Sequence, residues 1–224
     1  KNFERKKRFF SSKGEIDKKV LIEILPESPI IVEAGAHIGR DTIELAKLWP
    51  KGHIHAFEPV KNIYDQLVIN TIPYPNITCY QKALSDKDGT EKIFISSGSS
   101  DASSSLLKPK DHIRFHPTVL FNHHEYISSI TLESWVNQMK ISRIDFLWLD
   151  LQGMELPVLQ ASQAILDDVI AIYSEVNLKP LYENTPLYSA LRDWLESRGF
   201  LVEMELIPWK DAGNVLFINR RLDV

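Results

Sequence analysis

The chain has 224 residues, of which 44% are hydrophobic and 25% are charged, and its formal net charge is -4. This composition is ordinary for a globular protein, and the length allows one well-buried core rather than two large domains. A single cysteine, Cys79, excludes an internal disulfide and fits a reducing, cytoplasmic location, and every apolar run is shorter than the ~18 residues that cross a membrane.

Charge is unevenly distributed, because residues 1–14 are rich in Lys and Arg while the rest of the chain is acidic. The basic segment is either a patch for nucleic acid or a membrane surface, or a solvated tail that leads into a first helix; the tail is favoured. An acidic body repels phosphate backbones, so nucleic acid is disfavoured as a partner. We expect a tail and helix over 1–27 and a single domain over 28–224.

Short β-rich runs alternate with helical patterns along the chain. Strands are expected at residues 30–34, 53–57, 76–81, 91–96, 144–149, 169–176, 200–206 and 214–219. Helices are expected at residues 15–25, at the edge of the sheet, and at 40–48, 61–70, 131–139, 154–167 and 186–197. This alternation predicts an α/β fold with a doubly wound, mainly parallel sheet.

Two stretches are predicted to be loops with a functional role. Residues 96–105, SSGSSDASSS, have the composition of a flexible loop. The stretch after it, DHIRFHPTVLFNHHEY, is interpreted as a lid over the substrate. Its four histidines are either exposed or include a catalytic base; they are His112, His116, His123 and His124.

Two glycines follow the first expected strand, in IIVEAGAHIGRDTIEL. Gly35 permits a tight turn with positive φ, and Gly39 lets a ligand approach the backbone. The stretch lacks the G-x-G-x-x-G spacing that holds a pyrophosphate. Glu58 ends the second strand, and an acid about 20 residues beyond such a turn binds ribose hydroxyls in dinucleotide folds. Together these features predict a nucleoside site without phosphates.

Acidic residues also follow two later strands. Asp150 ends the apolar run IDFLWL, where burying a charge without a function is costly. Glu175 ends the next strand, so the two carboxylates are expected to meet and to raise the pKa of one of them. Glu155, after Gly153, is accounted for by capping the helix that it begins, and a catalytic role is the alternative.

The segments VEAGAHIG, HAFEP, ALSDKDG, TLESW, IDFLWLDLQGMELPVLQ and IYSEV, in this order, resemble the FkbM-type S-adenosylmethionine-dependent methyltransferases. The resemblance spans residues 28–206, and 144–159 is its most specific part. It implies a Rossmann-like, seven-stranded class I methyltransferase sheet whose final strand, in NVLFINR, is antiparallel. It also implies methyl transfer from S-adenosylmethionine to a hydroxyl oxygen of a small molecule or glycan.

The resemblance also implies site residues. Those for the cofactor are Glu33, Gly35, Ala36, His37, Gly39, Glu58, Pro59, Ala83, Leu84, Ser85 and Asp150. In this set Glu58 is the ribose-binding acid, residues 83–85 lie where such folds hold the adenine, and His37 either lines the pocket or packs away from it. The D-x-x-G-x-E element beside the methyl group falls on Asp150, Gly153 and Glu155. The chain departs from the family pattern at Trp148, Gln152 and Ser162, and the first two of these are expected at the methyl-transfer corner.

For the chemistry, Asp150 is the first candidate for a base or a hydroxyl orienter, and Glu175 is the second. The same strand ends offer Mg²⁺ the oxygens of Asp150, Glu175 and Asn177, in a layout like that of catechol O-methyltransferases, although a metal is not favoured. Two other functions stay open: a non-catalytic cofactor-binding protein with this fold, and a nicotinamide-dependent oxidoreductase, against which the missing G-x-G-x-x-G turn argues. The sequence leaves the acceptor and the oligomeric state open.

Overall fold

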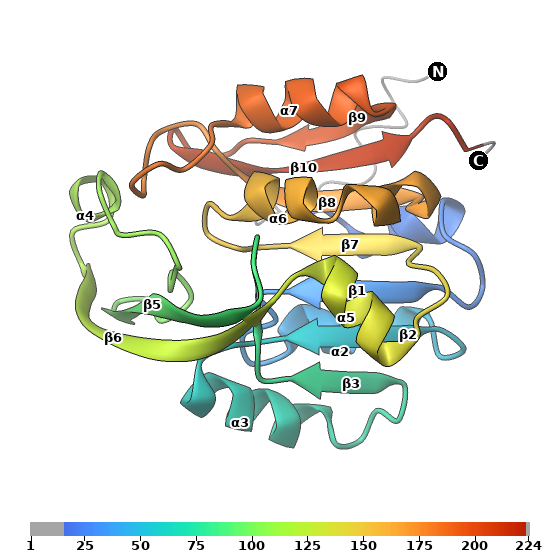
Figure 1. Cartoon of the computed structure of the whole chain (residues 1–224), viewed down its shortest axis with the longest axis horizontal. Coiled ribbons are helices and arrows are strands. Elements are labelled where there is room, and N and C mark those ends of the chain that lie inside the picture. Colours follow the sequence, from blue (N-terminus) through green and yellow to red (C-terminus); the bar gives the residue numbers. More distant parts are fainter. Residues whose placement is uncertain (1–15, 223–224) are drawn as a thin grey trace.

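The computed structural model describes residues 16–222 and has a central sheet with helices on both faces (Figure 1). The main sheet has seven strands in the order β3-β2-β1-β7-β8-β10-β9. They are β1 (Ile30–Ala34), β2 (His53–Phe57), β3 (Ile77–Tyr80), β7 (Phe146–Leu149), β8 (Ala171–Asn177), β9 (Phe200–Leu206) and β10 (Ala212–Asn219). The basic segment 1–14 lies outside the described residues.

The pairing of the strands places the ligand crevice. Strands β3, β2, β1, β7 and β8 are parallel, and β10 runs antiparallel to both of its neighbours. The chain order of the strands reverses between β1 and β7, so a crevice forms beyond the carboxyl ends of these two strands. The predicted seven-stranded sheet with a final antiparallel strand is confirmed.

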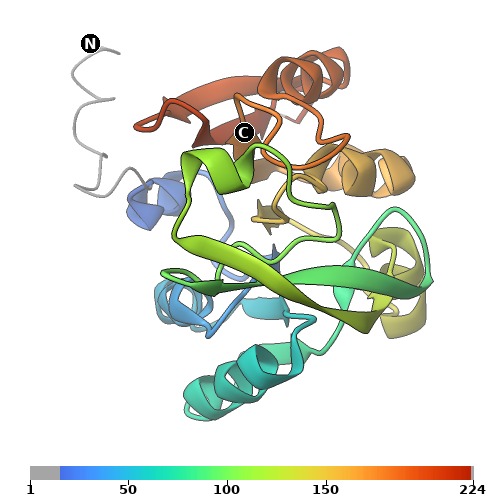
Figure 2. The ribbon, with the colours of Figure 1, turned by 90° about the vertical axis from the view of Figure 1, so that its left-hand side faces the viewer.

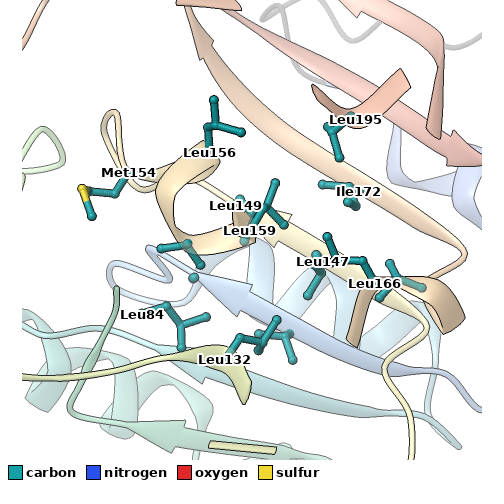
Figure 3. Close-up of a cluster of buried hydrophobic side chains, with 14 of the residues drawn as sticks. Leu84, Leu132, Leu147, Leu149, Met154, Leu156, Leu159, Leu166, Ile172 and Leu195 are labelled. Carbon is teal, nitrogen blue, oxygen red and sulfur yellow. The ribbon is translucent and has the colours of Figure 1, made fainter. Parts of the chain in front are cut away.

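Helices cover both faces of the sheet, which explains why its central strands are continuous apolar runs. One face carries α5 (Leu132–Met139), α6 (Glu155–Ala161) and α7 (Tyr188–Ser197); the other carries η1 (Lys18–Glu23), α2 (Arg40–Leu48) and α3 (Lys61–Thr71). Figure 3 shows Leu147 and Leu149 of β7 packed among the leucines of α5 and α6. Each such buried side chain stabilises the fold by about 1.5–3 kcal/mol.

The N-terminal helix differs from the prediction in type and place. The pattern of residues 15–25 predicts an α-helix at the sheet edge, but η1 is a short 3-10 helix capped by Asp17. It lies on the face of the central strands, where Ile16 N donates a hydrogen bond to the Tyr173 hydroxyl of β8 (3.3 Å). An aliphatic sequence of this length buries more apolar surface on the face of a sheet than at its edge.

A second sheet stands at the carboxyl ends of the main strands. Its order is β4-β6-β5, with β4 (Ala83–Leu84), β5 (Gly89–Gly98) and β6 (Val119–Ile130). Figures 1 and 2 show β5 and β6 crossing these ends as a long ribbon, with α4 (His112–Phe115) beside them. The strand predicted at 91–96 lies within β5. The loop predicted over 111–126 is wrong for residues 119–126, because they belong to β6 and pair along β5 as an antiparallel strand.

The helix predicted over 154–167 is interrupted. α6 ends at Ala161, and the 3-10 helix η2 (Gln163–Asp168) follows Ser162. Ser162 is fully buried, and its hydroxyl accepts a hydrogen bond from Glu133 N at the start of α5 (3.2 Å). This bond ties the break in one helix to the first turn of another. Within residues 16–222, every helix is too short or too polar to cross a bilayer.

Candidate active site

A cavity opens at the carboxyl ends of β1, β2 and β7, and the empty space in it, including the part open to solvent, is about 700 Å³. Its wall is formed by the turns after these three strands, by residues 82–84 and by the serine-rich stretch 101–106. The predicted site residues that line it are Gly35, His37, Glu58, Pro59, Ala83, Leu84 and Asp150. These residues are far apart in the sequence, and the strand order brings them together at the point where ligands bind in such sheets.

The other predicted residues lie outside this wall. Glu155, Glu175 and Asn177 border a separate, smaller pocket beside Gly153. The rest support the wall from behind or lie deeper in the fold; they are Glu33, Ala36, Gly39 and Ser85. The three proposed metal ligands are therefore not gathered around one point of the main cavity. Among residues 16–222, no group of three or more His, Cys, Asp or Glu side chains is arranged to hold a metal ion.

The two glycines of the first turn are required by packing. Both have positive φ, +87° at Gly35 and +85° at Gly39. A Cβ on Gly35 would lie 2.0 Å from the Asp150 carbonyl oxygen, so only glycine lets the turn after β1 lie against the end of β7. A Cβ on Gly39 would lie 2.7 Å from Leu67 of α3. This close contact with α3 accounts for a glycine at the start of α2, and Gly39 is not among the residues that line the cavity.

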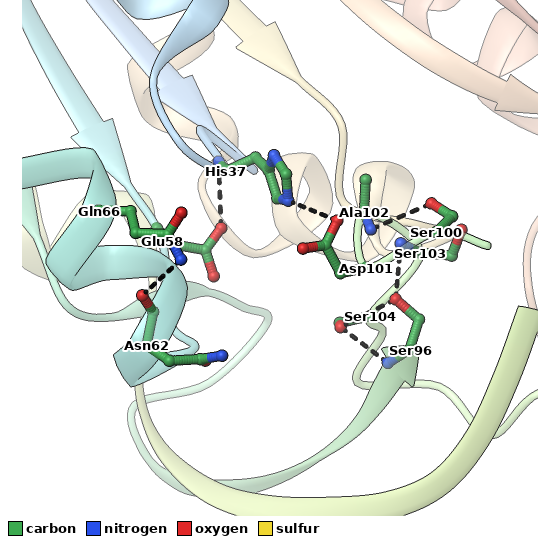
Figure 4. A network of polar contacts seen from close by, with 10 residues as sticks. All are labelled: His37, Glu58, Asn62, Gln66, Ser96, Ser100, Asp101, Ala102, Ser103 and Ser104. Atoms are coloured by element: carbon green, nitrogen blue, oxygen red, sulfur yellow. Dashed lines mark hydrogen bonds and ion pairs between the residues drawn. The ribbon is translucent and has the colours of Figure 1, made fainter. Parts of the chain in front are cut away.

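Glu58 is held in place at the cavity wall by backbone donors. Its carboxylate accepts hydrogen bonds from His37 N (3.1 Å) and Val60 N (2.8 Å), as drawn in part in Figure 4. Burial raises the pKa of Glu58 to about 7, and the two backbone hydrogen bonds oppose this shift. An ionised carboxylate fixed in this way can still accept hydroxyl groups from a ligand through its remaining lone pairs.

The serine-rich loop closes over the cavity opposite Glu58. Asp101 Oδ1 lies 3.1 Å from His37 Nε2, so the loop contacts the glycine turn directly (Figure 4). Ser103 N donates to Ser96 Oγ (2.9 Å), and Ser96 N donates to Ser104 Oγ (3.0 Å). The functional role predicted for this stretch fits its position, but the contact between Asp101 and His37 could not be predicted from the sequence.

The cavity has a polar side and an apolar side. Its carboxylates belong to Glu58, Asp101 and Asp150, and its lysine, Lys82, donates to the Ser128 hydroxyl (2.9 Å). The apolar side is formed by Val60, Ile63, Leu84, Ile93 and Leu106. Of these five residues only Leu84 was predicted from the sequence. An aliphatic residue that lines a cavity has the same sequence pattern as an aliphatic residue of the core. A surface of this kind favours a flat apolar ring, hydroxyl groups and a positive charge over a pyrophosphate.

Asp150 and Glu175 meet through Gln152. Gln152 Nε2 donates to Asp150 Oδ1 (2.6 Å) and to Glu175 Oε2 (2.7 Å), and the Tyr182 hydroxyl donates to Gln152 Oε1 (2.7 Å). Burial is the largest cause that raises the pKa of both carboxyl groups, and the charge of Asp150 raises that of Glu175 further. The prediction that neighbouring strand ends bring these two acids together agrees with this geometry, and Asp150 is the one that faces the cavity.

Glu155 bonds the backbone of its own turn. Its carboxylate accepts hydrogen bonds from Leu151 N (2.8 Å) and Gly153 N (3.1 Å), and it is buried at the start of α6. Burial raises its pKa to about 7, and these backbone bonds oppose the shift. The geometry fits the capping role considered for Glu155 and leaves it no contact with the main cavity.

Trp148 and Glu33 face the side of the sheet that carries η1 and α2. The two residues are paired across β1 and β7. The Trp148 ring lies 4.1 Å from the Tyr173 ring and 4.9 Å from the Lys18 ammonium, so its predicted place at the methyl-transfer corner is wrong. Trp148 packs in the cluster formed with η1 and α2, whereas Asp150 lies in the turn after β7 and borders the cavity. Glu33 is buried with one carboxylate oxygen unpaired among the described residues, and burial raises its pKa to about 8.

The four histidines considered as bases lie away from the cavity. His112 is buried against the rings of Phe121 and Tyr182, and His116 Nε2 lies 2.7 Å from Asp211. His123 and His124 project from β6. The histidine nearest to the chemistry is therefore His37, which lines the cavity beside Asp101.

Comparison with known proteins gives the family. The sequence model of the Methyltransferase FkbM domain matches residues 33–202, which includes every segment that lines the cavity. The chain belongs to this family. The resemblance seen in the sequence is thus confirmed, and the crevice described above lies in a methyltransferase domain.

Relatives of this FkbM methyltransferase agree with that assignment. It is 26% identical to the 2-O-methyltransferase NoeI of Sinorhizobium fredii, over 95% of this chain and 88% of that protein. Among solved structures, it resembles methyltransferase FkbM from Methylobacillus flagellatus KT, with a TM-score of 0.54 at 13% identity over 88% of this chain and 45% of that one. It also resembles magnesium protoporphyrin IX methyltransferase from Synechocystis PCC 6803 with bound SAM, with a TM-score of 0.51 at 11% identity over 89% of this chain and 74% of that one. At these identities the structures establish the fold.

Proposed function

We propose that this FkbM methyltransferase transfers the methyl group of S-adenosylmethionine to a hydroxyl oxygen of a small molecule or sugar. The observation that carries the proposal is the cavity at the reversal of strand order, with Glu58 fixed on one wall and aliphatic residues on another. Glu58 would hold the ribose hydroxyls, and Val60, Ile63 and Leu84 would contact the adenine. The nearby carboxylates favour the positive sulfonium and ammonium groups.

The chemistry that this chain must supply is orientation and proton removal. Bound S-adenosylmethionine supplies a methyl group that is already activated by its positive sulfur. Orientation of reactants contributes about 7–11 kcal/mol in favourable cases, and a positioned base contributes roughly two to four orders of magnitude in rate. Asp150 borders the cavity, and its Oδ2 makes no bond to Gln152. We assign to Asp150 the role of orienting the acceptor hydroxyl and accepting its proton.

Oxygen is the acceptor atom best supported. The relative of 26% identity that spans 95% of this chain is a 2-O-methyltransferase. A hydroxyl acceptor benefits from a base that takes its proton, and the Asp150 carboxylate at the cavity wall can serve as that base. A nicotinamide cofactor fits less well, because its pyrophosphate would face Glu58, Asp101 and Asp150.

The test has two stages. Calorimetric titration should show S-adenosylhomocysteine binding to the intact protein, and Glu58→Gln should weaken it. Labelled methyl from S-adenosylmethionine should then enter a fraction of a small-molecule or glycan extract, and Asp150→Asn should abolish this transfer. A protein that binds no S-adenosylhomocysteine would refute the proposal. A protein that binds it but labels no fraction would favour the non-catalytic alternative.

A further inference from the structure

The amide of Gln152 occupies the point between two carboxylates. Both of its N–H groups are used, one toward Asp150 Oδ1 at 2.6 Å and one toward Glu175 Oε2 at 2.7 Å. Two acceptors on one side fix the amide orientation, since its oxygen would be repelled there. Glu175 borders the smaller pocket and Asp150 the main cavity, so the Gln152 side chain joins the two.

Two further contacts hold Gln152 in this position. The buried Tyr182 hydroxyl donates to Gln152 Oε1 (2.7 Å), from the loop after β8. The Ser105 hydroxyl donates to the Gln152 carbonyl (2.8 Å), from the serine-rich loop. The Gln152 backbone has a positive φ of +51°, a conformation that is strained for a residue with a side chain. Contacts from two separate segments, at Tyr182 and Ser105, therefore stabilise Gln152 in an otherwise unfavourable backbone conformation.

The two groups that accept hydrogen bonds from the Gln152 amide are both acidic, and their charge suggests what the amide does. Two buried carboxylates near one point repel each other, and proteins relieve such repulsion with a proton, a cation or hydrogen-bond donors. Here the donors include the two N–H groups of one neutral amide, beside the hydrogen bond that the two carboxyl groups make with each other. Gln152 does not titrate, so it adds no third negative charge.

We propose that Gln152 is a positioning residue for methyl transfer, whose amide takes the place of a divalent cation between Asp150 and Glu175. The inference rests on the proposed function for its catalytic meaning. It assigns to this enzyme a metal-independent site, in which the amide fixes Asp150 Oδ1 and leaves Oδ2 to the acceptor hydroxyl. The Gln152 side chain thus determines whether methyl transfer by this enzyme requires a metal ion.

The experiment measures cation binding, which needs no acceptor. Gln152→Glu replaces the amide with a carboxylate of the same shape, so three carboxylate ligands should surround the central point. Titration with Mn²⁺, followed by electron paramagnetic resonance near neutral pH, should show binding at least about tenfold tighter than in the wild type. Adding Glu175→Gln to this variant should remove the gain. The matched control is Gln160→Glu, which adds the same charge at an exposed position of α6 and should not change the affinity.

A second variant covers the case in which Gln152→Glu does not fold, as judged by thermal unfolding. Gln152→Ala empties the place of the amide and should give a smaller gain in Mn²⁺ affinity. Two results would overturn the inference: Mn²⁺ binding by the wild type that is lost in Asp150→Asn, or no gain over Gln160→Glu in any folded Gln152 variant. Binding of S-adenosylhomocysteine by the wild type is measured separately, so failure of the proposed function is distinguishable from failure of this inference.

With a labelled acceptor fraction in hand, the same variants separate positioning from a structural role. Wild-type transfer should be unchanged by a chelator. Transfer by Gln152→Glu should fall and should be restored in part by Mg²⁺ or Mn²⁺. Rescue by a cation would not follow if Gln152 acted only by stabilising the fold, and chelator-sensitive transfer by the wild type would contradict the inference.

Discussion

Glu58 shows how one side chain can be both structural and ready to bind. Its two hydrogen bonds to backbone N–H groups tie the turn after β1 to the turn after β2. Because the carboxylate is fixed before a ligand arrives, binding does not have to order it. Its raised pKa also means that small changes near neutral pH alter its charge.

Affinity for S-adenosylhomocysteine should therefore depend on the ionisation of Glu58. The pKa of about 7 leaves the group mostly protonated at pH 6 and mostly ionised at pH 8. Only the ionised form accepts both ribose hydroxyls, so the dissociation constant should rise about tenfold from pH 8 to pH 6. Calorimetry at the two pH values measures this. Glu58→Gln should bind weakly at both, whereas the exposed control Glu133→Gln should follow the wild type. An equally steep dependence in Glu58→Gln would assign the titration to another group.

Glu33 should make stability depend on pH in the opposite sense to a salt-bridged acid. Burial raises its pKa from 4.5 to about 8 in the folded protein, so the folded state holds a proton that the unfolded state releases. This group therefore lowers the free energy of unfolding as pH rises from about 4.5 to 8. Glu33→Gln should be little different from the wild type at pH 5 and more stable by on the order of 5 kcal/mol at pH 9. Denaturant unfolding at both pH values measures the difference, and an equal effect at both would contradict the assignment.

At the scale of elements, the serine-rich loop and the glycine turn form a contact across the cavity mouth. The His37–Asp101 pair is partly exposed, with side-chain exposures of 32% and 61%, so its strength is that of a surface ion pair or less. A contact of this strength can slow the release of a ligand without controlling the stability of the fold.

Asp101→Asn should therefore increase the dissociation rate constant of S-adenosylhomocysteine by about two- to fivefold, which corresponds to a loss of up to ~1 kcal/mol. Stopped-flow displacement measures this rate. Glu27→Gln is the matched control, because it breaks an exposed pair with Lys51 (2.6 Å) that lies outside the cavity wall. Equal rates in Asp101→Asn and the wild type would show that the loop does not retain the ligand.

The elements also show which parts of the fold can be predicted from a sequence. The strands of the main sheet could be found because helices bury them on both faces, which makes runs such as FLWL of β7 uniformly apolar. Strand β6 could not, because most of its positions are exposed or half-buried and its pairing partner, β5, lies in the ribbon outside the main sheet. Its histidines and polar residues therefore look like a loop.

The site divides in the same way. Glu58 and Asp150 follow apolar strands directly, so their places at the strand ends could be read from the chain. The contacts of Gln152 with Tyr182 and of His37 with Asp101 join loops whose conformations depend on packing elsewhere. For Trp148, the resemblance gave the position in the chain but not the face of the sheet, which alternates residue by residue.

At the scale of the whole molecule, ligand binding should raise thermal stability. S-adenosylhomocysteine at about 100 times its dissociation constant adds ~2.7 kcal/mol to the free energy of unfolding. For a chain of this size, that corresponds to a rise in melting temperature of about 5–10 °C. Thermal unfolding with and without the ligand measures it. NADH at the same concentration should have no effect, and an equal shift with NADH would favour a dinucleotide site.

The Lys18 ammonium lies over the Trp148 ring and forms ion pairs with Asp41 and Glu44 of α2. These contacts determine how far the protein can be shortened from its N-terminal side. The sequence alone suggests trimming the chain at residue 28. A protein that begins at residue 28 would lack η1, so the Trp148 indole and the face of β8 that η1 covers would form an apolar surface exposed to water. The trimmed product should precipitate on expression, whereas one that starts ahead of Ile16 should stay in solution.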